Sequence, residues 1–155
     1  MDVFQTMFRR IMVATDGSPA SEKAIEVAAR LKLLIKESEV TVIHVSEPLP
    51  KVALKQGAEN SHGIVVIPDS ARADLVREKD EILEKARIMA EGIGIRVKLR
   101  SRTGDPASTI IDEAEKLGCD LIIIGGRGYG GFKNILGSVT TKVVNKFKGS
   151  VLVVK

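Results

Sequence analysis

The stretch that decides the fold of this chain reads Asp120-Leu-Ile-Ile-Ile-Gly-Gly-Arg-Gly-Tyr-Gly-Gly-Phe-Lys-Asn-Ile-Leu-Gly-Ser138. Its apolar run at residues 121–124 is typical of a strand buried on both faces. The glycines that follow let the backbone approach a ligand and turn amide groups toward an anion; they are Gly125, Gly126, Gly128, Gly130 and Gly131. After Ser138, apolar residues at helical spacing predict a helix. Phosphate bound at this helix N-terminus is the candidate ligand.

The charge distribution supports an anionic ligand at this end of the chain. Residues 121–155 hold six of the 24 Lys and Arg residues and none of the 20 Asp and Glu residues. The net charge of +4 therefore arises from the segment that carries the glycines. Because the surplus is confined to one segment and aromatic residues make up only 3% of the chain, we do not expect nucleic-acid binding.

Length and cysteine content predict one domain without disulfides. A chain of 155 residues can bury a sufficient hydrophobic core, and the single Cys119 excludes an internal disulfide. Neither a secretory signal nor an apolar run of membrane length is recognised. We expect a single cytoplasmic domain over residues 1–155 that does not bind membranes, with an N-terminal arm at 1–8 and a long loop at 46–68.

Strand and helix patterns alternate along the chain. Strands are expected at residues 11–14, 40–45, 95–100, 121–124 and 151–154. Helices are expected to start after the N-cap residues Ser18 and Ser138, at Pro106, and after Asp69 or Ser70. The alternation predicts an α/β fold, a doubly wound, Rossmann-like, five-stranded parallel sheet. Such sheets bind ligands at the carboxyl ends of their strands.

Two of these elements carry more detailed expectations. The helix after residue 69 is expected to turn an apolar face toward the sheet, made of Leu75, Ile82, Ala86 and Met89. The strand at 95–100 alternates apolar and basic residues, which is typical of a half-exposed strand. We therefore place that strand at an edge of the sheet.

Other phosphate-binding motifs do not fit the glycine segment. Gly126-Arg-Gly-Tyr-Gly-Gly131 matches G-x-G-x-x-G, but no acidic residue follows it to bind a ribose. No glycine in the stretch precedes the Lys and Ser or Thr of a Walker loop. Two histidines and one cysteine do not indicate a metal cluster.

The chain resembles the universal stress protein family over nearly its whole length. The resemblance includes Val13-Ala-Thr-Asp16-Gly-Ser, Ile43-His44-Val45, Gly104-Asp-Pro and residues 120–124. Gly125-Gly-Arg-Gly128, followed by Gly137-Ser138, resembles the nucleotide-binding signature Gly-x2-Gly-x9-Gly-Ser/Thr of the family's ATP-binding branch. Here eight residues separate Gly128 from Gly137, where the family has nine. Glycines would absorb a deletion in the loop, whereas one at the helix start would turn Ser138 by roughly 100°.

The resemblance implies a strand order of 3-2-1-4-5 and ATP as ligand, with Mg²⁺ as its candidate companion. It implies that Asp16 lies near the ribose or phosphates and that Val45 offers backbone groups to the adenine. The residues implied around the ribose and phosphates are Gly125, Gly128, Gly137, Ser138 and Val139. Arg127 and Lys133 are further candidate phosphate contacts, and solvated loop charges are the alternative interpretation. For Asp16 the alternative is a side chain that only holds its turn.

Three functional hypotheses remain. The first is a regulatory protein that binds ATP as a signal, with slow turnover at most, because no nucleophile with an orienting base is recognised. The second is an interaction module of the same fold without a ligand. The third, an ATP-cleaving enzyme of the wider adenine-nucleotide α/β superfamily, is weakened because Thr15-Asp-Gly-Ser18 stands where a Ser-Gly-Gly-x-Asp-Ser loop is expected.

The last strand carries an expectation about assembly. In the strand order of the family, residues 151–154 lie at a sheet edge, although they are uniformly apolar. An exposed apolar edge favours pairing with another strand. We therefore expect a homodimer joined along residues 151–154, as in the family.

Overall fold

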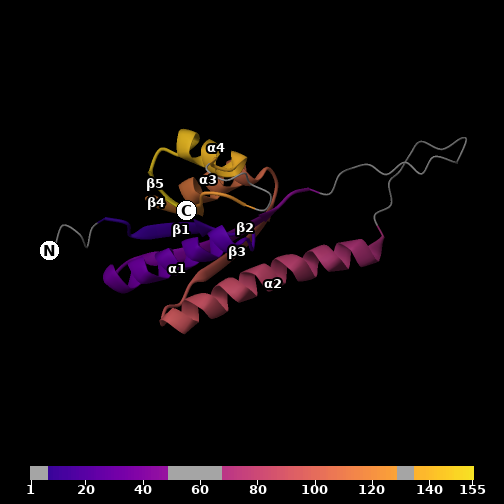
Figure 1. Ribbon diagram of the computed structural model, residues 1–155, viewed down its shortest axis with the longest axis horizontal. Helices are drawn as coiled ribbons and strands as arrows, with labels where there is room; N and C mark the ends of the chain where they lie inside the picture. The colour runs from indigo at the N-terminus through magenta and orange to yellow at the C-terminus, as the bar shows by residue number, and fades with distance from the viewer. Residues whose placement is uncertain (1–6, 49–67, 129–134) are drawn as a thin grey trace, which may run out of the picture.

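A computed structural model describes residues 7–48, 68–128 and 135–155 of the chain. The described residues form one five-stranded sheet in which all paired strands are parallel. Its order is β3-β2-β1-β4-β5, and four helices alternate with the strands (Figure 1). The expected doubly wound α/β sheet and its strand order are confirmed. Residues 1–6 of the expected arm at 1–8, residues 49–67 of the expected loop at 46–68, and Lys133 lie outside the described residues.

The bounds of the elements follow the apolar runs and caps of the sequence. The strands are β1 (Arg10–Ala14), β2 (Glu39–Ser46), β3 (Lys98–Thr103), β4 (Leu121–Gly125) and β5 (Ser150–Val154). The helices are α1 (Pro19–Leu34), α2 (Asp69–Ile93), α3 (Pro106–Lys116) and α4 (Ser138–Lys146). The N-cap Ser18 accepts a hydrogen bond from the Ser21 amide, as expected for the start of α1.

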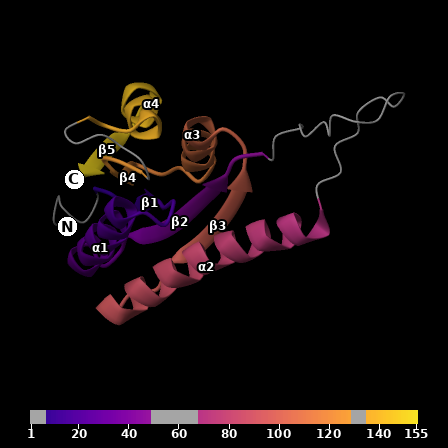
Figure 2. The ribbon, with the colours of Figure 1, turned by 45° about the vertical axis from the view of Figure 1, so that its right-hand side comes forward.

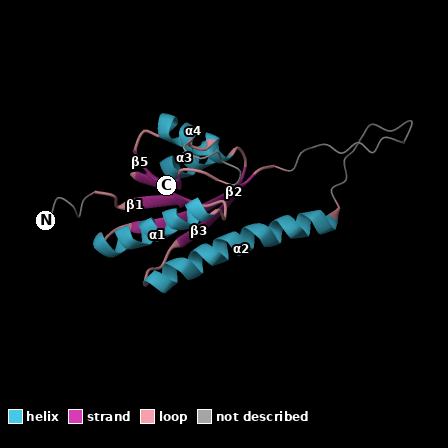
Figure 3. Cartoon of the chain, in the orientation of Figure 1, coloured by secondary structure: helices cyan, strands magenta, loops and turns pink. Residues whose placement is uncertain are grey.

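Helices cover both faces of the sheet, with α1 and α2 on one side and α3 and α4 on the other (Figures 2 and 3). Strand β1 contributes to both cores. Ile11 and Val13 pack in the core under α1 and α2, whereas Met12 and Ala14 pack in the core with α3. Because both faces of the central strands are covered, their sequences are continuous apolar runs.

The third strand begins three residues later than predicted, at Lys98, although its place at the sheet edge is confirmed. Residues 94 and 95 instead complete the end of α2. Gly94 adopts a φ of +98°, and the amide of Ile95 donates to the carbonyl of Ala90. Ile95 is buried against Ala29 and Ala90. The apolar residue that suggested a strand therefore anchors the helix end.

The predicted inner face of α2 is partly wrong. The buried residues of α2 are Leu83, Ala86 and Ala90. Ile82 and Met89 are half-buried, and Leu75 is 36% exposed because the first turns of α2 extend beyond the sheet (Figure 1). Pro68, rather than Asp69 or Ser70, occupies the N-cap position of this helix.

An ion pair with a buried carboxylate joins α3 to the edge strand β3. Glu113 is buried, and its Oε2 atom lies 2.9 Å from Nη2 of Arg102. Nζ of Lys116 lies 3.6 Å from Oε1 of the same carboxylate. The hydrogen bond from Arg102 holds the pKa of Glu113 below its usual value of 4.5.

Replacing Glu113 with Gln should lower the free energy of unfolding at pH 7 by about 1–2 kcal/mol, because a charge-assisted hydrogen bond is lost. A depressed folded-state pKa stabilises the fold above the unfolded pKa and loses that contribution as pH falls through the folded pKa. The difference between the two proteins, measured by urea unfolding, should therefore shrink below about pH 4.5. Glu115→Gln, an exposed change on the same helix, is the control. A difference in stability that persists at low pH would show that the charge of Glu113 is not its cause.

The end of β4 packs directly against the first turn of α1. A Cβ atom on Gly125 would lie 2.8 Å from the carbonyl carbon of Ala20. At the adjacent Gly126 the nearest atoms would lie 3.5 Å away, at ordinary contact distance. Backbone atoms cannot move aside as a flexible side chain can, so only Gly125 is required for close packing.

We expect Gly125→Ala to lower the free energy of unfolding by about 1–3 kcal/mol, the usual effect of overpacking. Gly126→Ala, the matched control, should change it by less than about 0.5 kcal/mol. Chemical denaturation of both variants measures the difference. Equal effects would show that the approach of β4 to α1 tolerates a methyl group.

Candidate functional site

A cavity of about 490 Å³ lies at the carboxyl ends of β1, β2 and β4. The chain adds β2 and β3 on one side of β1 and β4 and β5 on the other, so the winding reverses between β1 and β4. The residues that follow β1 and those that end β4 both line the cavity. The cavity therefore lies where doubly wound sheets bind their ligands.

The lining divides into apolar and polar residues. The apolar side chains come from strand ends and from the first turns of α3: Ala14, Ile43, Val45, Pro106, Ile110 and Ile124. The polar side chains follow β1 and β2 or lie near the starts of α1 and α4: Thr15, Asp16, Ser18, Ser21, Glu47, Arg127, Ser138 and Thr140. Gly125, Gly128, Gly137 and Val139 complete the lining.

The structure brings together every predicted site residue that it describes. Asp16, Val45, Gly125, Gly128, Gly137, Ser138 and Val139 all line this cavity, as does Arg127. Sequence reasoning missed Glu47, Ser21 and Thr140. Glu47 follows β2 by one residue, and Thr140 lies in the first turn of α4. Both residues are close in sequence to the predicted site residues Val45 and Val139, and this closeness was the signal that could have identified them.

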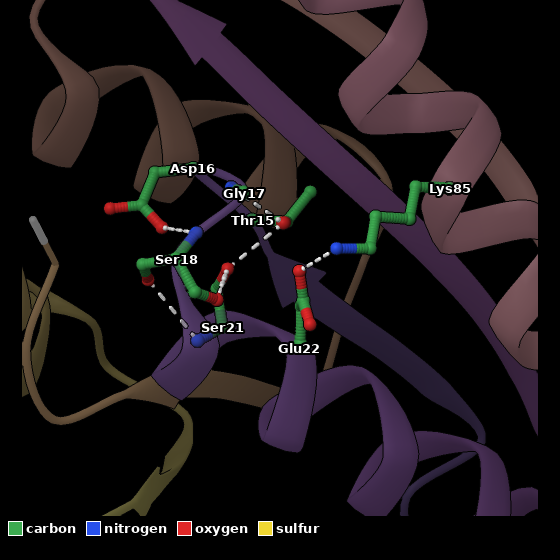
Figure 4. Close-up of polar contacts among 7 residues, drawn as sticks. All are labelled: Thr15, Asp16, Gly17, Ser18, Ser21, Glu22 and Lys85. Carbon is green, nitrogen blue, oxygen red and sulfur yellow. Dashed lines mark hydrogen bonds and ion pairs between the residues drawn. The ribbon is translucent and has the colours of Figure 1, made fainter.

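A network of short side chains shapes the turn after β1 (Figure 4). Oδ1 of Asp16 accepts a hydrogen bond from the amide of Ser18 at 2.9 Å. Oγ1 of Thr15 accepts from the amide of Gly17 at 3.2 Å and lies 3.1 Å from Oγ of Ser21. Asp16 therefore holds its own turn, which was the alternative interpretation of this residue, through one of its two carboxylate oxygens.

The second carboxylate oxygen of Asp16 faces the glycine segment. A Cβ atom on Gly128 would lie 2.5 Å from Oδ2 of Asp16. Any side chain at this position would displace the carboxylate or the loop. Glycine at 128 therefore lets the two segments approach each other across the cavity without moving the Asp16 carboxylate.

The start of α4 differs from the prediction that Ser138 is its N-cap. Gly137 occupies the N-cap position and Ser138 is the first helical residue. The Gly137 amide donates to the carbonyl of Gly126 at 2.8 Å, and Oγ1 of Thr140 donates to the carbonyl of Gly125 at 2.7 Å. Both bonds hold the helix start against the end of β4. Because Ser138 and Val139 line the cavity, the shorter glycine signature does not turn Ser138 away from it.

The helices that reach the cavity differ in how their N-termini are capped. Ser18 caps α1, and Asp105 caps α3 by accepting from the amide and hydroxyl of Ser108. These hydrogen bonds lower the pKa of Asp105. Gly137 offers no side chain to the first turn of α4. The amides of this turn keep their capacity to bind an anion.

No group of three or more His, Cys, Asp and Glu side chains is arranged to hold a metal ion within residues 7–48, 68–128 and 135–155. Over the same residues, every helix is too short or too polar to cross a membrane.

Comparison with known proteins gives a consistent result. The model of the universal stress protein family matches residues 7–155. Universal stress protein YxiE of Bacillus subtilis is 32% identical over 96% of this chain and 100% of its own length. Universal stress protein MJ0531 of Methanocaldococcus jannaschii is 33% identical over 97% of this chain and 84% of its own.

Solved structures agree with this relationship. The structure of MJ0577, a universal stress protein of Methanocaldococcus jannaschii, superposes with a TM-score of 0.77 at 30% identity, covering 97% of each chain. A universal stress protein from Archaeoglobus fulgidus, solved in complex with dAMP, has the same fold, with a TM-score of 0.63 at 22% identity over 97% of this chain and 100% of its own. The chain belongs to the universal stress protein family.

Proposed function

We propose that the cavity binds ATP, with Mg²⁺ as its companion ion, and that the bound nucleotide acts as a regulatory signal. The observation that carries this proposal is the start of α4, where a helix without a side-chain cap borders a cavity of about 490 Å³. A helix N-terminus presents unpaired amides and partial positive charge, which favours phosphate. The missing cap alone would favour any anion. The rest of the ligand must therefore be inferred from the residues on the opposite side of the cavity.

The apolar part of the lining suits an adenine ring. Ile43, Val45 and Ile110 supply apolar surface from β2 and α3, and Val45 offers backbone groups at the end of β2. An adenine ring needs apolar contact on its faces and hydrogen bonds at its edge. The ribose would then lie between these residues and the start of α4, near Asp16 and Gly128.

Relatives of this chain support the class of ligand. One universal stress protein structure was solved in complex with cAMP, and another in complex with dAMP. Both ligands are adenine nucleotides with a single phosphate. The step to ATP rests on the resemblance of Gly125, Gly128, Gly137 and Ser138 to the signature of the ATP-binding branch. Arg127 and Lys133 are proposed as additional phosphate contacts.

We propose a binding role in the cytoplasm for a single-domain protein, with slow hydrolysis at most. The carboxylate of Asp16 lies against Gly128, and one of its oxygens accepts a hydrogen bond from the Ser18 amide. The hydroxyls of Thr15 and Ser21 lie 3.1 Å apart, and those of Ser21 and Thr140 donate to backbone carbonyls. None of these partners is a basic side chain that could take a hydroxyl proton. These contacts favour retention of the nucleotide as a signal over its turnover.

Addition of magnesium ATP should raise the thermal midpoint. A ligand at 100 times its Kd stabilises by about 2.7 kcal/mol, which is roughly 5–10 °C for a chain of this size. Gly128→Asp should abolish the shift, because it places a side chain and a negative charge against Asp16. Gly92→Asp is the matched control, since no atom lies within 4 Å of a Cβ there. No shift at millimolar ATP would favour the ligand-free interaction module instead.

We further propose that the chain forms a homodimer through residues 151–154. The sheet has two edges with different chemistry. Edge strand β3 carries Lys98, Arg100 and Arg102, and charged side chains are a common protection against edge pairing. Edge strand β5 has apolar residues throughout 151–154, and Leu152 is 39% exposed. The unprotected edge is the better candidate for pairing.

Light scattering should give twice the chain mass at micromolar concentration. Leu152→Lys should shift the protein toward the monomer, because it places a charge on the proposed pairing edge. Leu99→Lys makes the same change on β3, where Leu99 is 36% exposed, and should leave the mass unchanged. A monomeric parent chain, or an equal effect of both substitutions, would rule out pairing through β5.

A further inference from the structure

We propose that Thr140 is a positioning residue that makes the cavity selective for the phosphate part of its ligand. The inference rests on the proposed nucleotide-binding function and extends it to a side chain that the glycine signature does not include. Thr140 is 3% exposed and lies in the first turn of α4. Its hydroxyl donates to the carbonyl of Gly125, the last residue of β4, at 2.7 Å.

This hydrogen bond connects the helix to the sheet. The Gly137 amide donates to the carbonyl of Gly126, and the Gly126 amide donates to the carbonyl of Val154 at the end of β5. The first turn of α4 is thus held against the end of β4, which is itself bonded to the end of β5. Two of the three bonds are made by the backbone, so Thr140 supplies the only one of them that depends on a side chain.

The geometry assigns Thr140 an indirect role. A hydroxyl group has one proton, and that of Thr140 is donated to Gly125. It cannot be donated to a phosphate oxygen at the same time. Thr140 therefore acts through the helix start, by fixing the direction of the amides of Ser138 and Val139, which line the cavity.

The neighbouring threonine provides a natural comparison. Oγ1 of Thr141 also donates to a backbone carbonyl, that of Gly137, at 2.9 Å. That bond stays within one turn of α4, and Thr141 is exposed and does not belong to the cavity lining. The two residues share the same side chain, the same helical turn and the same kind of hydrogen bond. They differ in whether the bond reaches the sheet.

The effect should be confined to ligands that carry phosphate. The apolar lining from β2 and α3 does not include the start of α4. The affinity for an adenosine bound against this lining should therefore not depend on the orientation of the amides at the start of α4. A phosphate group depends on the alignment of several amides, and a small misplacement weakens all of them together. Loss of the Thr140 hydroxyl should therefore change the ratio of ATP affinity to adenosine affinity.

The experiment is titration calorimetry of the full chain with ATP and adenosine at a temperature where each variant is folded. Thr140→Val should weaken ATP binding about tenfold, the effect of roughly one hydrogen bond, and change adenosine binding less than about twofold. Thr140→Ser keeps the hydroxyl and should retain the ATP affinity. Thr141→Val, the matched control, should keep both affinities within about twofold.

Amide hydrogen exchange of the ligand-free protein tests the positioning role separately. In Thr140→Val the amides of α4 should exchange faster by about tenfold, whereas those of α1 should not change. Weakened ATP binding with unchanged exchange would overturn the indirect role, since it would show direct contact with the ligand. Equal weakening of ATP and adenosine, or no weakening, would overturn the inference alone. Absence of both ATP and adenosine binding by the parent chain would overturn the proposed function and this inference together.

Discussion

The close backbone contact at the end of β4 is the constraint on which the rest of the structure depends. Gly125 lies against the backbone of Ala20 in α1, so no side chain fits between the strand and the helix. The next residue, Gly126, pairs through its amide with β5 and through its carbonyl with the start of α4. Four elements therefore meet at two adjacent glycines. Because three of these elements, β4, α1 and α4, also border the cavity, the packing that holds the fold together determines the shape of the site.

The cavity follows from the topology together with this contact. Reversal of the winding between β1 and β4 separates the connections that leave these strands, which opens a crevice at their carboxyl ends. The turn after β1 is held by Asp16 and Thr15, and Gly128 approaches the same carboxylate from the other side. The crevice is thus bounded on one side by a turn that side-chain hydrogen bonds hold in place, and on the other by a glycine that lies close to the same carboxylate.

Sequence patterns predicted the features that depend on nearby residues. The N-cap Ser18 and the start of α3 at Pro106 follow from local turn chemistry, and the buried run of β4 follows from its composition. The errors arose where distant parts of the chain decide the outcome. Ile95 was predicted to lie in a strand but completes the end of α2. Leu75 was predicted to be buried but is exposed, because the first turns of α2 extend beyond the sheet. Thr140 was missed because its partner, Gly125, is 15 residues away and becomes a neighbour only in the folded chain.

Gly137 shows how a small change in helix stability can favour ligand binding. Compared with the better N-cap residues, glycine at this position lowers helix stability by only a few tenths of a kcal/mol. The hydrogen bond from Thr140 to the sheet contributes about 1 kcal/mol, which is more than enough to compensate. A side-chain cap would have satisfied an amide of the first turn and competed with an incoming phosphate. Stabilising the start of α4 from the sheet, rather than by a cap, keeps the helix in place while its amides stay available to the proposed phosphate ligand.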